Sequence, residues 1–195
     1  MPEETAFSRH FIEGEGHAYV EGVATGVYPK ELKLANFTRR MLYLRPDLFL
    51  LVDELAAREP RLFQWRLASL GSFEVGPERG QFTLIKGEVA LDIVVAWPPQ
   101  WTHAIGETPL LGGYCSGMDY TVRYLGIEAP HKVWETTFVT LLTPRPEDRT
   151  PDFPQAEAVR ENGLLGIKIT HKGREWQVRM TQRDRTEERI EVVGS

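Results

Sequence analysis

Apolar and polar residues alternate with a period of two along much of this chain, and this alternation restricts what the chain can fold into. Because successive side chains of a strand point to opposite faces, the spacing produces a sheet with one apolar and one polar face. The alternation is clearest in four segments: residues 63–67, 89–95, 165–170 and 176–180. These segments are predicted to be half-buried antiparallel strands.

Turn-forming residues stand between such segments, where hairpins need them. Arg45-Pro46-Asp47 separates two apolar segments, and its proline presets φ for a turn. Glu161-Asn162-Gly163 and Lys172-Gly173 are typical of hairpin tips, because Asn and Gly tolerate positive φ. About ten strands with this spacing indicate a sandwich. The sequence therefore predicts an all-β fold, an antiparallel double-sheet β-sandwich, as a single domain over residues 1–195.

Some segments depart from the simple alternation. Residues 97–114 contain so many prolines and glycines that we expect one long Pro/Gly-rich loop there. Residues 143–154 are expected to be a polar connection, and residues 154–160 one helical turn. Residues 37–68 are predicted to form three consecutive antiparallel strands of one sheet, with Trp65 facing the core.

The composition excludes several kinds of partner. Lys and Arg total 23 against 28 Asp and Glu, a net charge of −5, with both signs interspersed. Nucleic acid is not an expected partner, because phosphate binding needs a concentrated basic surface. The apolar run at residues 48–52 is far shorter than the roughly 20 residues that span a bilayer, so no membrane partner is predicted. Cys115 is the only cysteine, so no intramolecular disulfide is expected.

Residues 28–69 carry a more specific order of motifs. Residues 22–29 end in Tyr28-Pro29 and lead to the pair Arg39-Arg40, followed by a hairpin over residues 44–55. The next strand reads Phe63-Gln64-Trp65-Arg66-Leu67-Ala68-Ser69. This order resembles the C-terminal β-sandwich of heparinase II/III-like polysaccharide lyases. The family often has a histidine where this chain has Ala68.

The resemblance implies a β-sandwich domain that supports or extends a polysaccharide-binding cleft and is not catalytic alone. Its implied ligand is an acidic polysaccharide or oligosaccharide. Family lyases abstract a proton next to a uronic-acid carboxylate, with residues drawn largely from an N-terminal α/α-toroid. No helical region of that kind exists in this sequence, so the resemblance implies such a toroid domain or subunit as a partner. Enzyme activity of the chain itself is left open.

Many family members also hold a metal through an H-x-H, a following Asp and a later His. His10 and His17 do not reproduce that spacing, so no metal and no cofactor are expected. The acidic residues 1–4 do not begin a signal peptide, although members of the family are often periplasmic or secreted.

No catalytic residue is predicted. Cys115-Ser116 lies in a glycine-rich segment with no recognisable base nearby, and the side chains of Asp53 and Glu54 diverge on a strand. Asp53 is instead expected to pair with Arg39 or Arg40 on the adjacent strand.

The aromatic residues in and beside the predicted long loop suggest sugar binding, since a sugar ring can lie on an aromatic side chain. The alternative for each tryptophan is a place at the edge of the core. Arginines gathered on one face, such as Arg39, Arg40 and Arg66, would favour an anionic glycan. The substrate-binding candidates are His17, Tyr19, Arg66, Trp97, Trp101 and Tyr114.

Two other functions remain open. The chain could be a free-standing carbohydrate-binding or protein-interaction module. It could also be a small β-sheet enzyme that uses His17, which requires His10, His17 and His131 to share one pocket.

Overall fold

The computed structural model describes residues 6–110, 120–161, 164–181 and 190–194. These residues contain fifteen strands and two short 3-10 helices, joined by turns and loops, and no α-helix occurs in them. The strands are β1 (Phe7–Glu13), β2 (His17–Val23), β3 (Leu34–Leu44), β4 (Leu48–Arg61), β5 (Gln64–Ser69), β6 (Ser72–Val75), β7 (Gln81–Lys86), β8 (Val89–Trp97), β9 (Thr102–Leu110), β10 (Tyr120–Glu128), β11 (Val133–Pro146), β12 (Gln155–Glu161), β13 (Leu164–His171), β14 (Arg174–Thr181) and β15 (Ile190–Gly194). The 3-10 helices are η1 (Thr25–Val27) and η2 (Lys30–Leu32).

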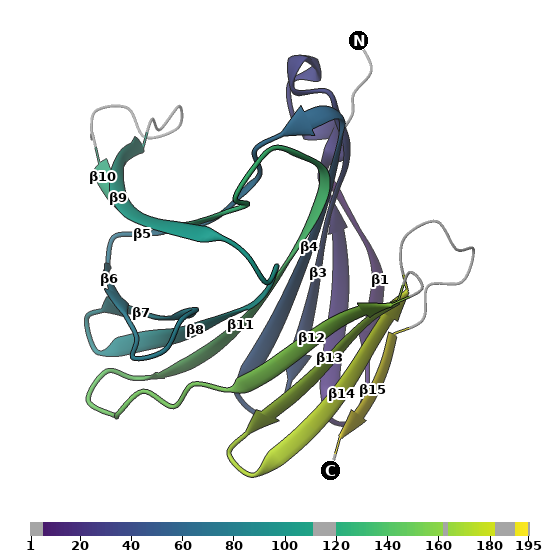
Figure 1. Cartoon of the computed structure of the whole chain (residues 1–195). Coiled ribbons are helices and arrows are strands. Elements are labelled where there is room, and N and C mark those ends of the chain that lie inside the picture. The colour runs from purple at the N-terminus through teal and green to yellow at the C-terminus, as the bar shows by residue number, and fades with distance from the viewer. Residues whose placement is uncertain (1–5, 111–119, 162–163, 182–189, 195) are drawn as a thin grey trace.

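The strands form three antiparallel sheets. A central eight-stranded sheet has the order β1-β2-β3-β4-β11-β8-β7-β6. A three-stranded sheet has the order β5-β10-β9, and a four-stranded sheet has the order β12-β13-β14-β15. Figure 1 shows the four-stranded sheet at the lower right and the three-stranded sheet at the upper left of the central sheet. The predicted class, an all-β antiparallel sandwich, is confirmed.

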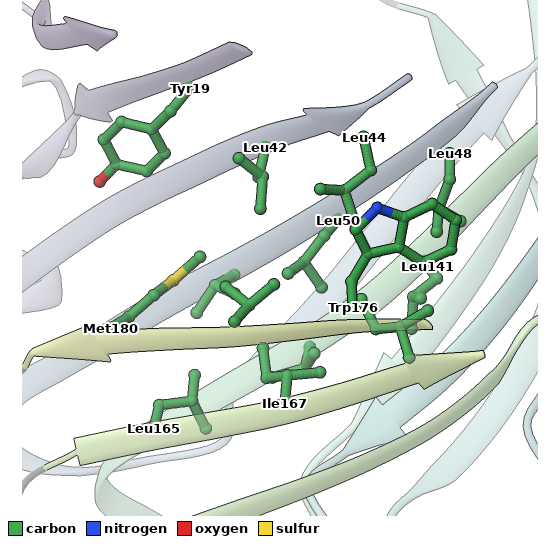
Figure 2. Packing of buried hydrophobic residues seen from close by; sticks show 14 residues of the cluster. Tyr19, Leu42, Leu44, Leu48, Leu50, Leu141, Leu165, Ile167, Trp176 and Met180 are labelled. Carbon is green, nitrogen blue, oxygen red and sulfur yellow. The ribbon is translucent and has the colours of Figure 1, made fainter. Parts of the chain in front are cut away.

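Each smaller sheet covers one face of the central sheet. Even-numbered residues of β4, such as Leu48 and Leu50, share a first core with Ile167 and Trp176 of the four-stranded sheet. Figure 2 shows these side chains meeting between the two sheets. Ala57 of β4 points the other way, into a second core that includes residues of β5 and β10. The apolar run at residues 48–52 thus belongs to a strand covered on both faces, which favours near-continuous hydrophobicity.

The first two strands of the predicted three-stranded unit are confirmed, but the third is placed wrongly. β3 pairs with β4 as expected, whereas β5 pairs with β10 in the three-stranded sheet. The reason is that β4 already has β3 on one edge and β11 on the other, so no edge remains for β5. Trp65 nevertheless faces the core and is only 4% exposed.

The described part of the chain has fifteen strands where the sequence predicted about ten, and two of the additional strands lie in segments expected to be irregular. Residues 102–110 of the predicted long loop form β9, which pairs with β10. Pro109 is tolerated there because β9 is an edge strand of its sheet. Residues 155–160, predicted as a helical turn, belong to β12 and pair with β13. The hairpin turn at Lys172-Gly173 is confirmed, with φ of 50° and 75°.

Candidate functional site

A pocket of about 480 Å³ opens between the central sheet and β5, the edge strand of the three-stranded sheet. The central sheet contributes odd-numbered residues of β3 and β4, which lie on the face away from the four-stranded sheet. The loop before β3 and the start of β5 complete the walls. The lining residues are Ala6, Gly22, Val23, Ala24, Tyr28, Phe37, Arg39, Asp53, Leu55, Gln64, Trp65, Arg66 and Phe138.

The floor of the pocket carries a bidentate ion pair. Arg39 and Asp53 are direct cross-strand partners on β3 and β4. Nε of Arg39 donates to Oδ1 of Asp53 at 2.7 Å, and a terminal nitrogen donates to Oδ2 at 2.8 Å. The hydrogen bond from Arg39 to Asp53 raises the pKa of Arg39 above its ordinary value. Both oxygens of Asp53 are therefore engaged, and the predicted pairing of Asp53 is confirmed.

A second arginine stands at the rim of the pocket. Arg66 is exposed, and its Nε donates to Oε1 of Gln64 at 2.9 Å. Its guanidinium lies 4.2 Å from the centroid of the Tyr124 ring, a cation–π contact. Arg66 is therefore held in place by neutral groups rather than by a carboxylate.

Aromatic and apolar side chains form the remaining walls. The ring of Tyr28, which is 41% exposed, lies 5.5 Å from the ring of Phe37 in a tilted arrangement. A smaller, mostly apolar cavity of about 230 Å³ adjoins the pocket and shares Tyr28, Phe37, Leu55 and Gln64 with it. The larger pocket thus combines aromatic and apolar walls with the polar groups of Arg39, Asp53, Gln64 and Arg66.

Trp65 adds an unused donor to this wall. Its indole Nε1 is buried and has no hydrogen-bond partner within the described ranges. A buried donor without a partner costs free energy, so an acceptor oxygen that reached it would be stabilised.

The arrangement supports binding better than catalysis. It offers guanidinium donors, an amide and aromatic rings, but the one carboxylate among its described lining residues is hydrogen-bonded to Arg39. Among the described residues, no group of three or more His, Cys, Asp or Glu is placed to hold a metal ion. No helix in this part of the chain is long and apolar enough to span a membrane.

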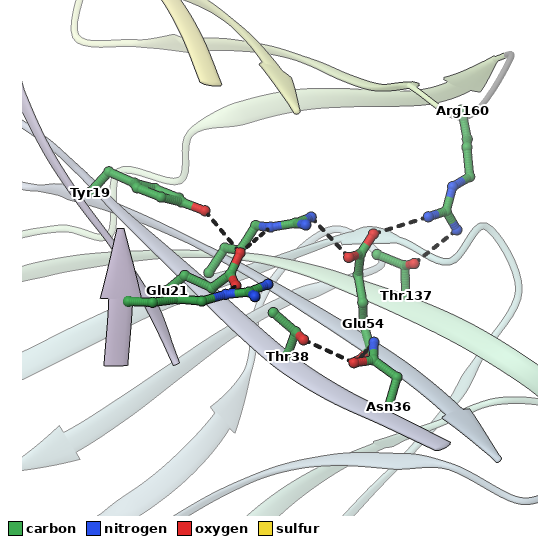
Figure 3. A network of polar contacts seen from close by, with 9 residues as sticks. Tyr19, Glu21, Asn36, Thr38, Glu54, Thr137 and Arg160 are labelled. Carbon is green, nitrogen blue, oxygen red and sulfur yellow. Dashed lines mark hydrogen bonds and ion pairs between the residues drawn. The ribbon is translucent and has the colours of Figure 1, made fainter. Parts of the chain in front are cut away.

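The opposite face of the central sheet carries a buried network of charges (Figure 3). Glu21 of β2 accepts from Arg9 and from Arg40, the latter at 3.1 Å. Arg40 lies 2.9 Å from Glu54 of β4, and Glu54 accepts from Arg160 of β12 at 3.1 Å. Each charge in this row lies between opposite charges or next to one, so the row ties β1, β2, β3, β4 and β12 together.

The pKa shifts of Glu21 and Arg40 favour the charged forms of these two residues. Burial alone would raise the pKa of Glu21, but hydrogen bonds from Arg9 and Arg40 bring it below its ordinary value. Burial would lower the pKa of Arg40, but the charge of Glu54 and the contacts with Glu21 raise it. Because the charged side chains of the row are paired with one another, we assign this network a structural role.

The structure disperses the six predicted substrate-binding residues. Arg66 lines the pocket described above. Tyr19 is buried in the first core, and Trp97 packs against that same core.

His17 lies at the opposite end of β2 from the pocket. Trp101 packs against the second core, and the centroid of its ring lies 6.2 Å from that of Phe82. Tyr114 lies outside the described residues.

The three histidines of the alternative enzyme hypothesis do not line this pocket. Of the arginines considered together, Arg39 and Arg66 share the pocket, while Arg40 points to the opposite face. Sequence reasoning missed Tyr28 and Gln64 as site residues. The signal that could have found them was their place within the heparinase-like motif, Tyr28 at its start and Gln64 in its last strand.

Comparisons with known proteins agree with this architecture. No protein-family model matches the chain, and no curated protein does. Solved structures do match, and what they share with this chain is the fold, which corresponds to one part of each of them.

The chain is similar to the heparan sulfate lyase HepC from Pedobacter heparinus, with a TM-score of 0.68 and 14% identity. The match covers 93% of this chain and 29% of the lyase. Two structures of heparinase III match with TM-scores of 0.71 and 0.70 and identities of 9% and 12%. Each match covers 90% of this chain and 27% of the heparinase. The predicted resemblance to the heparinase II/III-like sandwich is therefore confirmed in the fold, and the chain spans little more than a quarter of those lyases.

Proposed function

We propose that residues 1–195 form one β-sandwich domain of a heparinase-like polysaccharide lyase that extends a polysaccharide-binding cleft and is not catalytic alone. The observation that carries this proposal is the pocket beside β5, with Arg39 and Arg66 among aromatic walls. The fold shared with heparinase III and HepC supports the assignment to this kind of lyase.

The ligand in this proposal is an acidic polysaccharide or oligosaccharide. Tyr28 offers an exposed ring for the apolar face of a sugar, and Gln64 and Arg66 offer groups for its oxygens. Among the lining residues that the structure describes, no carboxylate is free to act as a general base, because both oxygens of Asp53 accept from Arg39. Elimination is accordingly assigned to a companion domain, an N-terminal α/α-toroid.

A free-standing carbohydrate-binding module is the second candidate. It is favoured by the fact that five strands, the loop before β3 and Ala6 of this chain together line the pocket. Both candidates predict sugar binding, and they differ in whether an α-helical toroid accompanies the domain. The reading frame upstream of the coding sequence distinguishes them.

The binding role is tested by isothermal titration calorimetry of the protein with oligosaccharides of heparan sulfate and of alginate. We expect saturable binding that Tyr28→Ala weakens about tenfold, since the aromatic surface for the sugar is lost. Trp134→Ala is the matched control, because Trp134 is 59% exposed and does not line the pocket. Equal losses in both variants would contradict the placement of the site.

The non-catalytic role is tested with the same protein. Heparin, heparan sulfate and alginate are incubated with it, and ultraviolet absorbance of the unsaturated product is followed. We expect no turnover by this chain alone. Sustained turnover without added metal would overturn the proposal.

A further inference from the structure

The two arginines of the pocket differ in how their charge is balanced. Arg39 is neutralised by Asp53, through two hydrogen bonds. Arg66 has no carboxylate within 4.0 Å among the described residues. The charged groups of the described lining are Arg39, Asp53 and Arg66. The pocket therefore carries one uncompensated positive charge, in a chain whose net charge is −5.

Arg66 is also held in a defined orientation. The Tyr124 ring supports the face of its guanidinium at 4.2 Å, and Oε1 of Gln64 accepts from its Nε at 2.9 Å. These contacts use one edge and one face of the planar group. The two terminal nitrogens make no hydrogen bond within the described residues, and together they match the two oxygens of a carboxylate or sulfate.

Two glycines make room for the side chains that hold Arg66. Gly106 of β9 lies directly opposite Tyr124, and a Cβ there would come 2.8 Å from Oη of Tyr124. Gly126 of β10 lies directly opposite Arg66, and a Cβ there would come 3.0 Å from the side-chain amide of Gln64. A larger residue at either position would displace the supporting side chain.

We infer that Arg66 is the residue that selects acidic sugars at this pocket, by binding an oxyanion of one sugar unit with its two terminal nitrogens. Tyr124 and Gln64 are positioning residues, which fix the guanidinium before the sugar arrives. The inference rests on the proposed function, because it assigns the ligand class of the same pocket. The oxyanion is a carboxylate or a sulfate, which share the geometry that Arg66 matches.

The test compares affinities for four tetrasaccharides of one backbone, measured by calorimetry. One carries carboxylates alone, one carries sulfates alone after carboxyl reduction, one carries both, and one carries neither. We expect Arg66→Gln to weaken binding of the preferred acidic sugar about tenfold, the usual effect of one charge-assisted contact. Affinity for the neutral sugar should change by less than about twofold, since it offers no oxyanion.

Arg66→Lys keeps the positive charge but loses the pair of terminal nitrogens that can bind two oxygens at once. The affinity of this variant for the acidic sugar should therefore fall between those of the parent protein and Arg66→Gln. Tyr124→Leu should reduce the preference for acidic over neutral sugar, while Tyr124→Phe, which keeps the ring, should retain it. Arg179→Gln is the charge-matched control, because Arg179 is exposed on the four-stranded sheet and pairs with Glu191. It should leave all four affinities unchanged.

The outcomes separate this inference from the proposed function. If the parent protein prefers acidic sugars and Arg66→Gln preserves that preference, the inference is wrong and the proposed function stands. If the parent protein binds acidic and neutral sugars alike, the inference is also wrong. If the parent protein binds none of the four, the proposed function itself fails, and the inference fails with it.

Discussion

Trp65 and Gln64 are neighbours on β5 whose side chains have different surroundings. Trp65 is buried in the second core, whereas Gln64 is half-buried at the pocket. Trp65→Ala should lower the free energy of unfolding by about 3–5 kcal/mol, because it removes a large apolar side chain and leaves a cavity. Gln64→Ala should cost less than about 1 kcal/mol. Chemical denaturation of both variants tests this, and equal losses would show that the facing of β5 is wrong.

His171 is a buried histidine at the end of β13, 3% exposed. Neither ring nitrogen has a hydrogen-bond partner in the described part of the chain. Burial lowers the pKa of His171 below its ordinary value, and Lys172 adds to this effect. The carboxylates of Asp152, Asp47 and Asp92 act in the opposite direction but do not outweigh burial. The folded state therefore favours neutral His171.

This shift predicts a loss of stability in mild acid. Below a pH of about 6.5 an unfolded histidine takes up a proton that folded His171 resists, so the unfolded state binds more protons. The stabilising contribution is complete above that pH and declines as the pH falls toward the lowered pKa, by at most about 1.4 kcal/mol per pH unit. His171→Gln removes the titration. The unfolding free energy of the parent should fall more steeply with acid than that of the variant, and parallel profiles would refute the assignment.

At the scale of elements, the charge row ties the four-stranded sheet to the central sheet. Arg160 of β12 donates to Glu54 of β4 at 3.1 Å and to Oγ1 of Thr137 of β11 at 2.9 Å. Arg160→Met should cost about 1–3 kcal/mol, because it leaves Thr137 unpaired and Glu54 with fewer partners. Arg179→Met is the control. Its pair with Glu191 is exposed, so its loss should cost less than about 1 kcal/mol.

Thermal and chemical denaturation of the two methionine variants measures this difference. If Arg160→Met is as stable as Arg179→Met, the row does not stabilise the contact between the sheets. An increase in stability would show that the desolvation cost of Arg160 exceeds its gain from the ion pair.

Strand existence was easier to predict than strand pairing. The alternation in β13 and β14 and the turn at Lys172-Gly173 follow from local side-chain chemistry, and the structure confirms them. The alternation predicted for β8 is wrong, because Ala90 and Asp92 are buried as well as Ile93 and Val95, so both faces of that strand are covered. The pairing partner of β5 could not be predicted from local sequence. It depends on β11, a strand distant in sequence that occupies the other edge of β4. β9 was missed because its proline is tolerated only on an edge strand, and local sequence does not reveal which strands are edges.

The candidate site was predicted in part, for the same physical reason. The pairing of Asp53 with Arg39 or Arg40 was predictable because the strands are joined by one tight turn, and the structure identifies Arg39 as the partner. Arg66 was a candidate through its motif. Its support by Tyr124 was not predictable, because β5 and β10 are far apart in sequence and meet only in the folded sheet.

At the scale of the whole molecule, the structural charge row and the proposed binding pocket lie on opposite faces of the central sheet. One face carries the first core and the buried charge row, and the other carries the second core and the pocket. The sugar-binding surface is thus expected on the face away from the four-stranded sheet. This expectation is the central claim of the proposed function.

The five tryptophans allow one direct measurement of that claim, because each contributes one indole N–H signal to a nitrogen–proton NMR spectrum. The signals are assigned with single Trp→Phe variants, and an acidic tetrasaccharide is then titrated into the parent protein. Trp65 lines the pocket, so its signal should move most, while those of Trp134 and of Trp176 under the four-stranded sheet should stay in place. Saturable movement of the Trp134 or Trp176 signal with a stationary Trp65 signal would contradict the account.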